Sequence, residues 1–128
     1  MRSKYCVRQS DVTPYSPANH TGTKNYRLIG PETVGAKQVE VLIGELGRGK
    51  GALPHAHPGI EQVCYLLEGA AHVEVAGEAF DMEKGDCCFF PADAQHVFTV
   101  TSASAQVMVI YSPPYGEDPA KVNRPRAH

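Results

Sequence analysis

Three of the six histidines in this 128-residue chain stand where a metal site would need them. His55 and His57 are separated by one residue, and a two-residue step along an extended strand sends both side chains to the same face. The pair follows a glycine-rich turn, and His96 stands further along the chain, before another strand-like segment. Two imidazoles on one face are the usual start of a zinc or transition-metal site.

The segment around the histidine pair resembles the first of two motifs of the cupin superfamily. That motif is similar to G-x5-H-x-H-x(3,4)-E-x6-G, and its spacings are matched by Gly49, His55, His57 and Gly69. The resemblance implies that both histidines bind one divalent metal ion. It also implies an all-β fold, a small double-stranded β-helix (jelly-roll) barrel.

His96 lies in a segment that is similar to the second cupin motif, G-x5-P-x-G-x2-H-x3-N. Gly85, Pro91 and His96 match, whereas Asp93 replaces the internal glycine and Val100 the final asparagine. Neither replaced position normally carries the metal, so the resemblance implies His96 as the third ligand. We expect the two replacements to affect the geometry of the turn and to leave the metal ligands in place.

The fourth implied ligand is one of two adjacent residues, Glu61 and Gln62. Successive strand residues point to opposite faces, so only one of the two can face the metal. Gln62 keeps the spacing of the motif to Gly69, and many small cupins similar to this chain have a glutamine there. We therefore predict that His55, His57, Gln62 and His96 bind the metal, with Glu61 as the alternative to Gln62.

The choice of fourth ligand decides the chemistry of the metal. A glutamine oxygen brings no charge, so the ion would polarise a carbonyl or bind an anionic substrate strongly. Glu61 would instead give the arrangement of three histidines and one carboxylate that is common in oxygen-using and decarboxylating cupins. We expect one divalent transition metal (iron, manganese, nickel, cobalt or zinc), and open positions for substrate favour the first four over tetrahedral zinc.

The elements that must position these residues are short strands separated by glycines. Residues 38–43 and 72–75 alternate apolar and polar side chains with the period of two that is typical of strands. Residues 63–69 form a more continuous apolar run, as expected of a strand covered on both faces. No segment has a convincing apolar repeat at helical spacing, so an all-β sandwich or barrel is predicted.

The same alternation predicts what surrounds the metal. Counting from Gln62 puts Cys64 and Leu66 on the metal-facing side, and counting from His96 turns Phe98 and Val100 inward. The predicted pocket, lined by Cys64, Leu66 and Phe98, is therefore largely apolar around a polar centre, as in many small-molecule sites.

The chain length favours one domain. We predict an irregular N-terminal arm over residues 1–25, the cupin barrel over 26–112 and an exposed, proline-rich tail over 113–128, or one that reaches a neighbouring subunit. Barrels that resemble this one usually form homodimers by exchanging an N-terminal strand, and residues 5–12 can serve as that strand.

Composition excludes several classes of partner. With a formal net charge of −2, the chain gives no reason to expect nucleic acid or an anionic membrane. No apolar stretch is long enough to span a membrane, and the N-terminus lacks the apolar core of a secretory signal, so we expect a cytoplasmic protein. Cys6, Cys64, Cys87 and Cys88 show no CxxC spacing, which favours free, buried thiols.

Three functions are compatible with this sequence. The first is a metalloenzyme that acts on a small oxygenated metabolite by isomerase, lyase or hydration chemistry, because the position of Gln62 resembles that in sugar-acid-processing cupins. The second is a non-haem dioxygenase, and the third is a non-catalytic ligand-binding barrel. The general acid or base stays open among Glu61, Glu40 and Tyr65. Arg27 is either a clamp for a substrate carboxylate or, more ordinarily, part of a solvated face.

Overall fold

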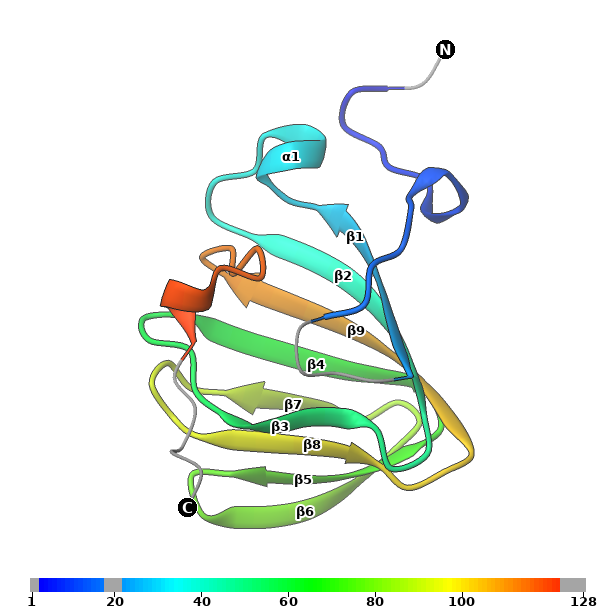
Figure 1. Ribbon diagram of the computed structural model, residues 1–128, viewed down its shortest axis with the longest axis vertical. Coiled ribbons are helices and arrows are strands. Elements are labelled where there is room, and N and C mark those ends of the chain that lie inside the picture. The colour runs from blue at the N-terminus through cyan, green and yellow to red at the C-terminus, as the bar shows by residue number, and fades with distance from the viewer. Residues whose placement is uncertain (1–2, 18–21, 123–128) are drawn as a thin grey trace.

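A computed structural model describes residues 3–17 and 22–122 of the chain (Figure 1). Residues 1–2, 18–21 and 123–128, which belong to the predicted arm and tail, lie outside the described residues. The strands are β1 (Thr23–Ile29), β2 (Glu40–Gly47), β3 (Gly51–His55), β4 (Glu61–Glu68), β5 (Ala70–Val75), β6 (Glu78–Glu83), β7 (Cys87–Phe90), β8 (His96–Val100) and β9 (Ser104–Ser112). The short helical segments are η1 (Gln9–Asp11), α1 (Pro31–Val34) and η2 (Pro119–Lys121).

The strands form two antiparallel sheets that together make the barrel. One sheet has the order β1-β2-β9-β4-β7 and the other the order β3-β8-β5-β6, so the chain passes between the sheets several times (Figure 1). Sequence neighbours such as β2 and β3 lie in different sheets, whereas β2 pairs with the distant β9. This connectivity confirms the predicted all-β class and the jelly-roll barrel.

The barrel interior is filled by alternate residues of each strand. On β4, Gln62, Cys64 and Leu66 are buried, and on β8, His96, Phe98 and Val100 are buried. The alternation predicted for both strands is therefore correct. Each large apolar side chain removed from water in this way contributes about 1.5–3 kcal/mol to folding.

The outer face of β4 and β7 is not fully covered by the residues that the structure describes. Tyr65 on β4 is 39% exposed and Phe89 on β7 is 49% exposed. The expectation that residues 63–69 are covered on both faces is therefore wrong for the single chain, because the second sheet packs on one face only. Of the four thiols, Cys64 and Cys88 are buried as expected, whereas Cys6 and Cys87 are exposed.

Two turns explain positions in the cupin motifs. Gly69 between β4 and β5 has φ +95°, and a Cβ there would lie 2.5 Å from the Ser104 carbonyl oxygen, so only glycine fits. Asp93 takes the place of a motif glycine with φ +68°, a left-handed conformation that aspartate tolerates better than most residues. Its amide donates to the His57 carbonyl oxygen (3.2 Å), which ties this turn to the metal-site loop.

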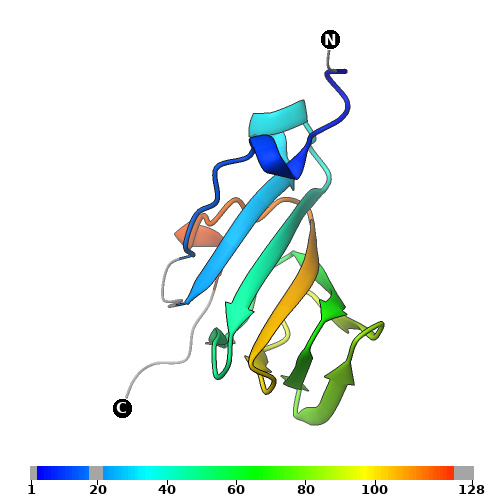
Figure 2. The same ribbon diagram turned by 90° about the vertical axis from the view of Figure 1, so that its right-hand side faces the viewer.

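Both ends of the described chain pack on the barrel. The first strand begins at Thr23, inside the range predicted as the arm, and Tyr15 pairs with Asn25, so the arm runs beside β1 (Figure 2). At the other end, Tyr115 and Val122 are buried. Residues 113–122 are thus exposed over most of their length, as predicted for the tail, but Pro114, Tyr115 and Val122 pack on their own barrel.

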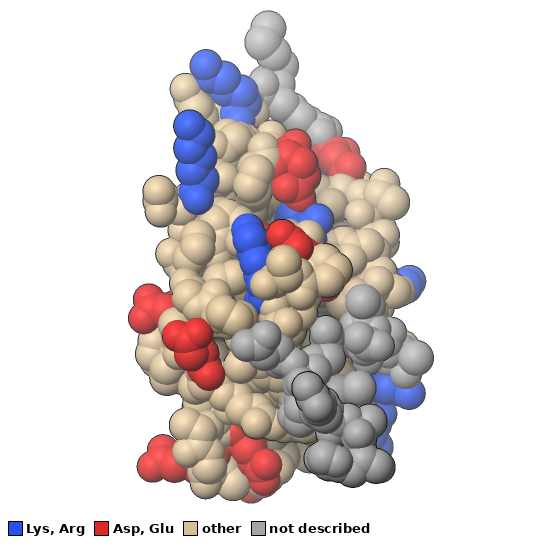
Figure 3. Space-filling model, turned by 60° about the vertical axis from the view of Figure 1, so that its left-hand side comes forward, with Lys and Arg blue, Asp and Glu red and all other residues tan. Residues whose placement is uncertain are grey.

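The described surface and helices bear on the predicted partners. No helix of the described residues has the length and apolar character needed to cross a membrane. On the face shown in Figure 3, acidic and basic side chains are scattered among uncharged ones and form no continuous basic surface.

Candidate metal centre and its cavity

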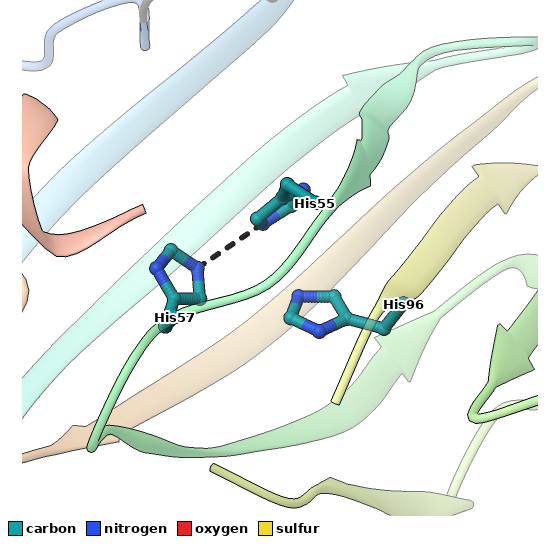
Figure 4. A group of neighbouring side chains, drawn as sticks. All are labelled: His55, His57 and His96. Atoms are coloured by element: carbon teal, nitrogen blue, oxygen red, sulfur yellow. Dashed lines mark hydrogen bonds between the residues drawn. The ribbon is translucent and has the colours of Figure 1, made fainter. Parts of the chain in front are cut away.

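The three motif histidines converge inside the barrel (Figure 4). His55 ends β3 and pairs across the sheet with His96, the first residue of β8, while His57 follows two residues after His55. One nitrogen of each ring lies within 4.8 Å of those of the other two, and all three side chains are buried. The Nε2 atoms of His55 and His57 are 3.1 Å apart. The sequence prediction that these residues come together is correct.

Backbone carbonyls orient two of the rings. His57 Nδ1 lies 3.0 Å from the Lys121 carbonyl oxygen, and His96 Nδ1 lies 3.3 Å from that of Ala94. A carbonyl oxygen only accepts, so each Nδ1 carries the proton and donates it, which leaves each Nε2 with a lone pair. Such outer contacts are typical of metal-binding histidines because they fix the tautomer and the direction of the ring.

His96 is held in its neutral form. Burial, together with repulsion from His55 and His57, lowers the pKa of His96 to about 3. The ring also stacks on Phe90, with centroids 4.0 Å apart and planes 1° from parallel. A neutral imidazole is the form that binds metals, so this ring is ready to act as a ligand at neutral pH.

Two buried polar atoms at this centre have no hydrogen-bond partner among the described residues: His96 Nε2 and Gln62 Oε1. The other end of the Gln62 amide donates from Nε2 to Cys64 Sγ (3.4 Å), which accounts for the orientation of the amide. Each unpaired buried acceptor destabilises the fold by about 1–3 kcal/mol. A cation between them would remove that cost, so the residues present fit a divalent metal with nitrogen and oxygen ligands.

The two residues considered for the fourth ligand lie on opposite faces of β4. Gln62 is buried and lines the same cavity as His55 and His96, whereas Glu61 is exposed on the outer face. Gln62 is paired in the sheet with Phe90 on one side and Tyr111 on the other.

A cavity that is partly open to solvent adjoins the histidines. Cys64 and Phe98 line it as predicted. Leu66 does not: its side chain is completely buried in the filled part of the core, one inward position beyond Cys64. The apolar pocket predicted from the sequence therefore exists, but Leu66 is not part of its wall.

Two tyrosines that sequence reasoning missed complete the wall beside the histidines. Tyr111 ends the inward row of β9, and its ring centroid lies 5.4 Å from that of His57; Tyr115 follows β9 and lies 4.4 Å from His57. Burial raises the pKa of Tyr111 well above its usual value, so this phenol stays protonated and can donate a hydrogen bond. Alternation along β9 could have identified Tyr111.

Glu61, Glu40 and Tyr65 were the candidate acid–base residues, and none is among the residues that line the cavity in the described structure. Glu61 and Tyr65 face outward. Glu40 is only 1% exposed, but its carboxylate is fully engaged: it accepts from Arg27 Nε (2.6 Å) and from the amides of Tyr115 and Gly116 (2.9 Å each).

Arg27 is thus neither a substrate clamp nor a solvated residue. Besides Glu40 it contacts Glu32 (3.0 Å), and its guanidinium donates to the Tyr15 hydroxyl (2.9 Å). The Arg27–Glu40 pair has a structural role, because Glu40 binds the backbone near the start of residues 113–122. This contact positions Tyr115 against His57. We call residues 113–122 the C-terminal strap.

A family model described as a cupin domain matches residues 42–111, more than half of the chain. The chain therefore belongs to the cupin family, as the sequence motifs predicted.

Several known proteins are similar to this chain. Polyketide synthase CurC of Streptomyces cyaneus is 27% identical over 113 residues, which make up 88% of this chain and 73% of that protein. Among solved structures, KdgF from Halomonas sp. matches with a TM-score of 0.77 at 19% identity and covers 91% of this chain and 98% of its own. The polyketide cyclase RemF from Streptomyces resistomycificus matches with a TM-score of 0.71 at 22% identity, over 89% of this chain and 80% of its own. The structural matches establish the fold.

Proposed function

We propose that this cupin is a metal-dependent enzyme in which His55, His57, Gln62 and His96 bind one divalent transition metal. Its substrate is a small oxygenated metabolite, and its chemistry is of the isomerase, lyase or hydration type. The observation that carries the proposal is the pair of buried, unpartnered acceptors, His96 Nε2 and Gln62 Oε1, beside the converging histidines and an open cavity.

The character of the donor set supports this class of reaction. Three imidazoles and an amide oxygen add no negative charge, so a bound divalent ion would be a strong Lewis acid that polarises a substrate carbonyl. Stabilising the enolate-like charge that follows is a step that isomerisations, eliminations and cyclisations share. A relative that is a polyketide synthase and a structural neighbour that is a polyketide cyclase agree with such carbonyl chemistry.

The remaining residues of the wall have roles in binding and orientation. The Tyr111 hydroxyl, kept protonated by burial, would donate a hydrogen bond to a substrate oxygen. Tyr115 packs against His57 and limits the movement of its ring. The Lys121 carbonyl oxygen of the strap accepts a hydrogen bond from His57 Nδ1, so the strap holds the ring direction needed for ligation.

The direct test is elemental analysis of the purified protein and of three variants, His96→Ala, Gln62→Ala and the matched outer-face control Glu61→Gln. The proposal predicts near-stoichiometric metal in the wild type and in Glu61→Gln, and loss in the other two. Metal retained by Gln62→Ala but lost from Glu61→Gln would move the fourth ligand to Glu61. Absence of metal after reconstitution would reject the enzyme and favour a binding barrel.

Measuring oxygen uptake distinguishes the proposed function from the alternative of a non-haem dioxygenase. The protein loaded with ferrous iron would consume oxygen stoichiometrically with a substrate if it were a dioxygenase. The proposed function predicts turnover that is unchanged under anaerobic conditions.

A homodimer is also proposed. The exposed Phe89 and Tyr65 form an apolar outer face on β7 and β4, which a second copy of the chain would cover. Light scattering would report twice the monomer mass for the wild type and a shift toward monomer for Phe89→Lys. The cytoplasmic location stays a prediction.

A further inference from the structure

A third unpartnered polar group lines the same cavity, away from the histidines. Thr23, the first residue of β1, is 4% exposed, and its Oγ1 has no hydrogen-bond partner among the described residues. A buried hydroxyl without a partner is unfavourable unless a ligand or a water bonds to it. Thr23 Oγ1 is therefore a candidate contact for whatever occupies the cavity.

Sheet register places Thr23 far from the metal centre. Thr23 is paired with Leu46, near one end of β2. Gln62 is paired with Tyr111, and Tyr111 is in turn paired with Glu40 at the other end of β2. At about 3.3 Å per residue, these levels are about 20 Å apart along the strand. A cavity that is lined by both Gln62 and Thr23 is therefore elongated.

The wall between the two ends is mostly apolar, with the buried Asn25 of β1 as a polar exception. Its apolar part is formed by Leu42 and Leu46 of β2, Val107 and Val109 of β9 and Phe98 of β8. Such a wall favours a ligand whose middle part is hydrophobic.

The cavity also offers no side-chain cation. No lysine or arginine is among its lining residues in the described part of the chain, and Glu117 adds a carboxylate. Phosphates and carboxylates are normally bound by arginine or lysine, so a sugar acid or a sugar phosphate would find only the metal as a counter-charge.

From these features we infer that the site takes an elongated, uncharged and largely apolar carbonyl compound, with an oxygen at the metal end and a hydrogen-bonding group at Thr23. Enolisable 1,3-diketones with aromatic or extended apolar ends fit this description. The inference rests on the proposed function for the metal end only. It departs from the sugar-acid substrate that the position of Gln62 suggested.

Calorimetric titration of the cobalt-loaded full chain tests the inference. The probes are dibenzoylmethane, its analogue with a hydroxyl on the para position of one ring, and glucuronate. We expect both diketones to bind at least about 100-fold more tightly than glucuronate. Thr23→Val should weaken the hydroxylated probe by about five- to tenfold, the effect of one hydrogen bond, and leave dibenzoylmethane unchanged.

Matched variants guard the result against a folding defect. Thr23→Ser keeps the hydroxyl and should bind the hydroxylated probe within about twofold of the wild type, and the exposed Thr101→Val should change nothing. Glucuronate binding as tight as the diketones, or an equal loss of both diketones in Thr23→Val, would overturn the inference. If the chain binds no cobalt, the proposed function fails, and the same titrations of the metal-free chain still test the Thr23 contact.

Discussion

The two ends of the barrel interior are built from the same strands but are opposite in character. On β4, Gln62 belongs to the polar end and Leu66 to the filled end; on β8, His96 and Val100 are divided in the same way. The filled end contains apolar side chains that are at most 2% exposed, such as Leu66 and Val100. The polar end contains two acceptors that have no partner among the described residues, His96 Nε2 and Gln62 Oε1. Stability thus comes from one end of each strand, and the capacity for chemistry from the other.

The largest loss of stability is expected from a substitution at the filled end. Leu66→Ala removes a completely buried side chain and leaves a cavity, so the free energy of unfolding should fall by about 3–4 kcal/mol. Urea unfolding of the metal-free protein measures this loss. Metal content per folded chain should not change, and a parallel loss of metal would show that the two ends are not independent.

The second-largest loss of stability is expected at the C-terminal strap, which connects the core to the metal centre. Glu40→Gln leaves Arg27 without its closest buried counter-charge and should lower the free energy of unfolding by about 2–3 kcal/mol. It should also weaken metal binding, since Glu40 positions the strap that contacts His57. Competition with a chelator measures the metal affinity. If the variant is less stable but binds metal with unchanged affinity, the strap has no role in metal binding.

Acid should weaken the metal-free protein through His96. Its folded pKa of about 3 lies below the value of 6.5 that it has when unfolded, so between these values the unfolded chain binds the extra proton. Stability therefore falls as the pH drops below about 6.5, by about 2 kcal/mol between pH 7 and pH 5. Urea unfolding at both pH values measures this loss, and His96→Gln is the control that lacks the contribution of His96. If the free energy of unfolding falls equally with pH in the two proteins, the loss does not come from His96.

The smallest expected effect has the opposite sign. Gln62→Leu removes a buried unpartnered oxygen, so the metal-free protein should become more stable by about 1 kcal/mol. Metal affinity should fall at the same time. Thermal unfolding and chelator competition on one preparation measure both quantities, and a destabilised variant would mean that Gln62 is satisfied in a way the described contacts omit.

The contrast also marks what the sequence could predict. His55, His57 and His96 were predictable because the cupin motifs are local patterns that fix strand and turn together, and Gln62 followed from strand alternation. Tyr111 was within reach of the same alternation along β9.

The strap was not predictable in this way. Tyr115 depends on Glu40, 75 residues earlier, and the local signal of the strap, several prolines, suggested exposure. The inward direction of Thr23 likewise depends on pairing with Leu46, which no short pattern encodes.

The most direct test of the account is metal-linked stability in three proteins: wild type, His96→Ala and Leu66→Ala. A metal that binds only the folded chain raises the free energy of unfolding with its concentration, by about 2.7 kcal/mol at 100 times the dissociation constant. We expect the full increment in the wild type and, from a lower baseline, in Leu66→Ala, and none in His96→Ala. An equal increment in His96→Ala would contradict the claim that the polar end of the barrel binds the metal.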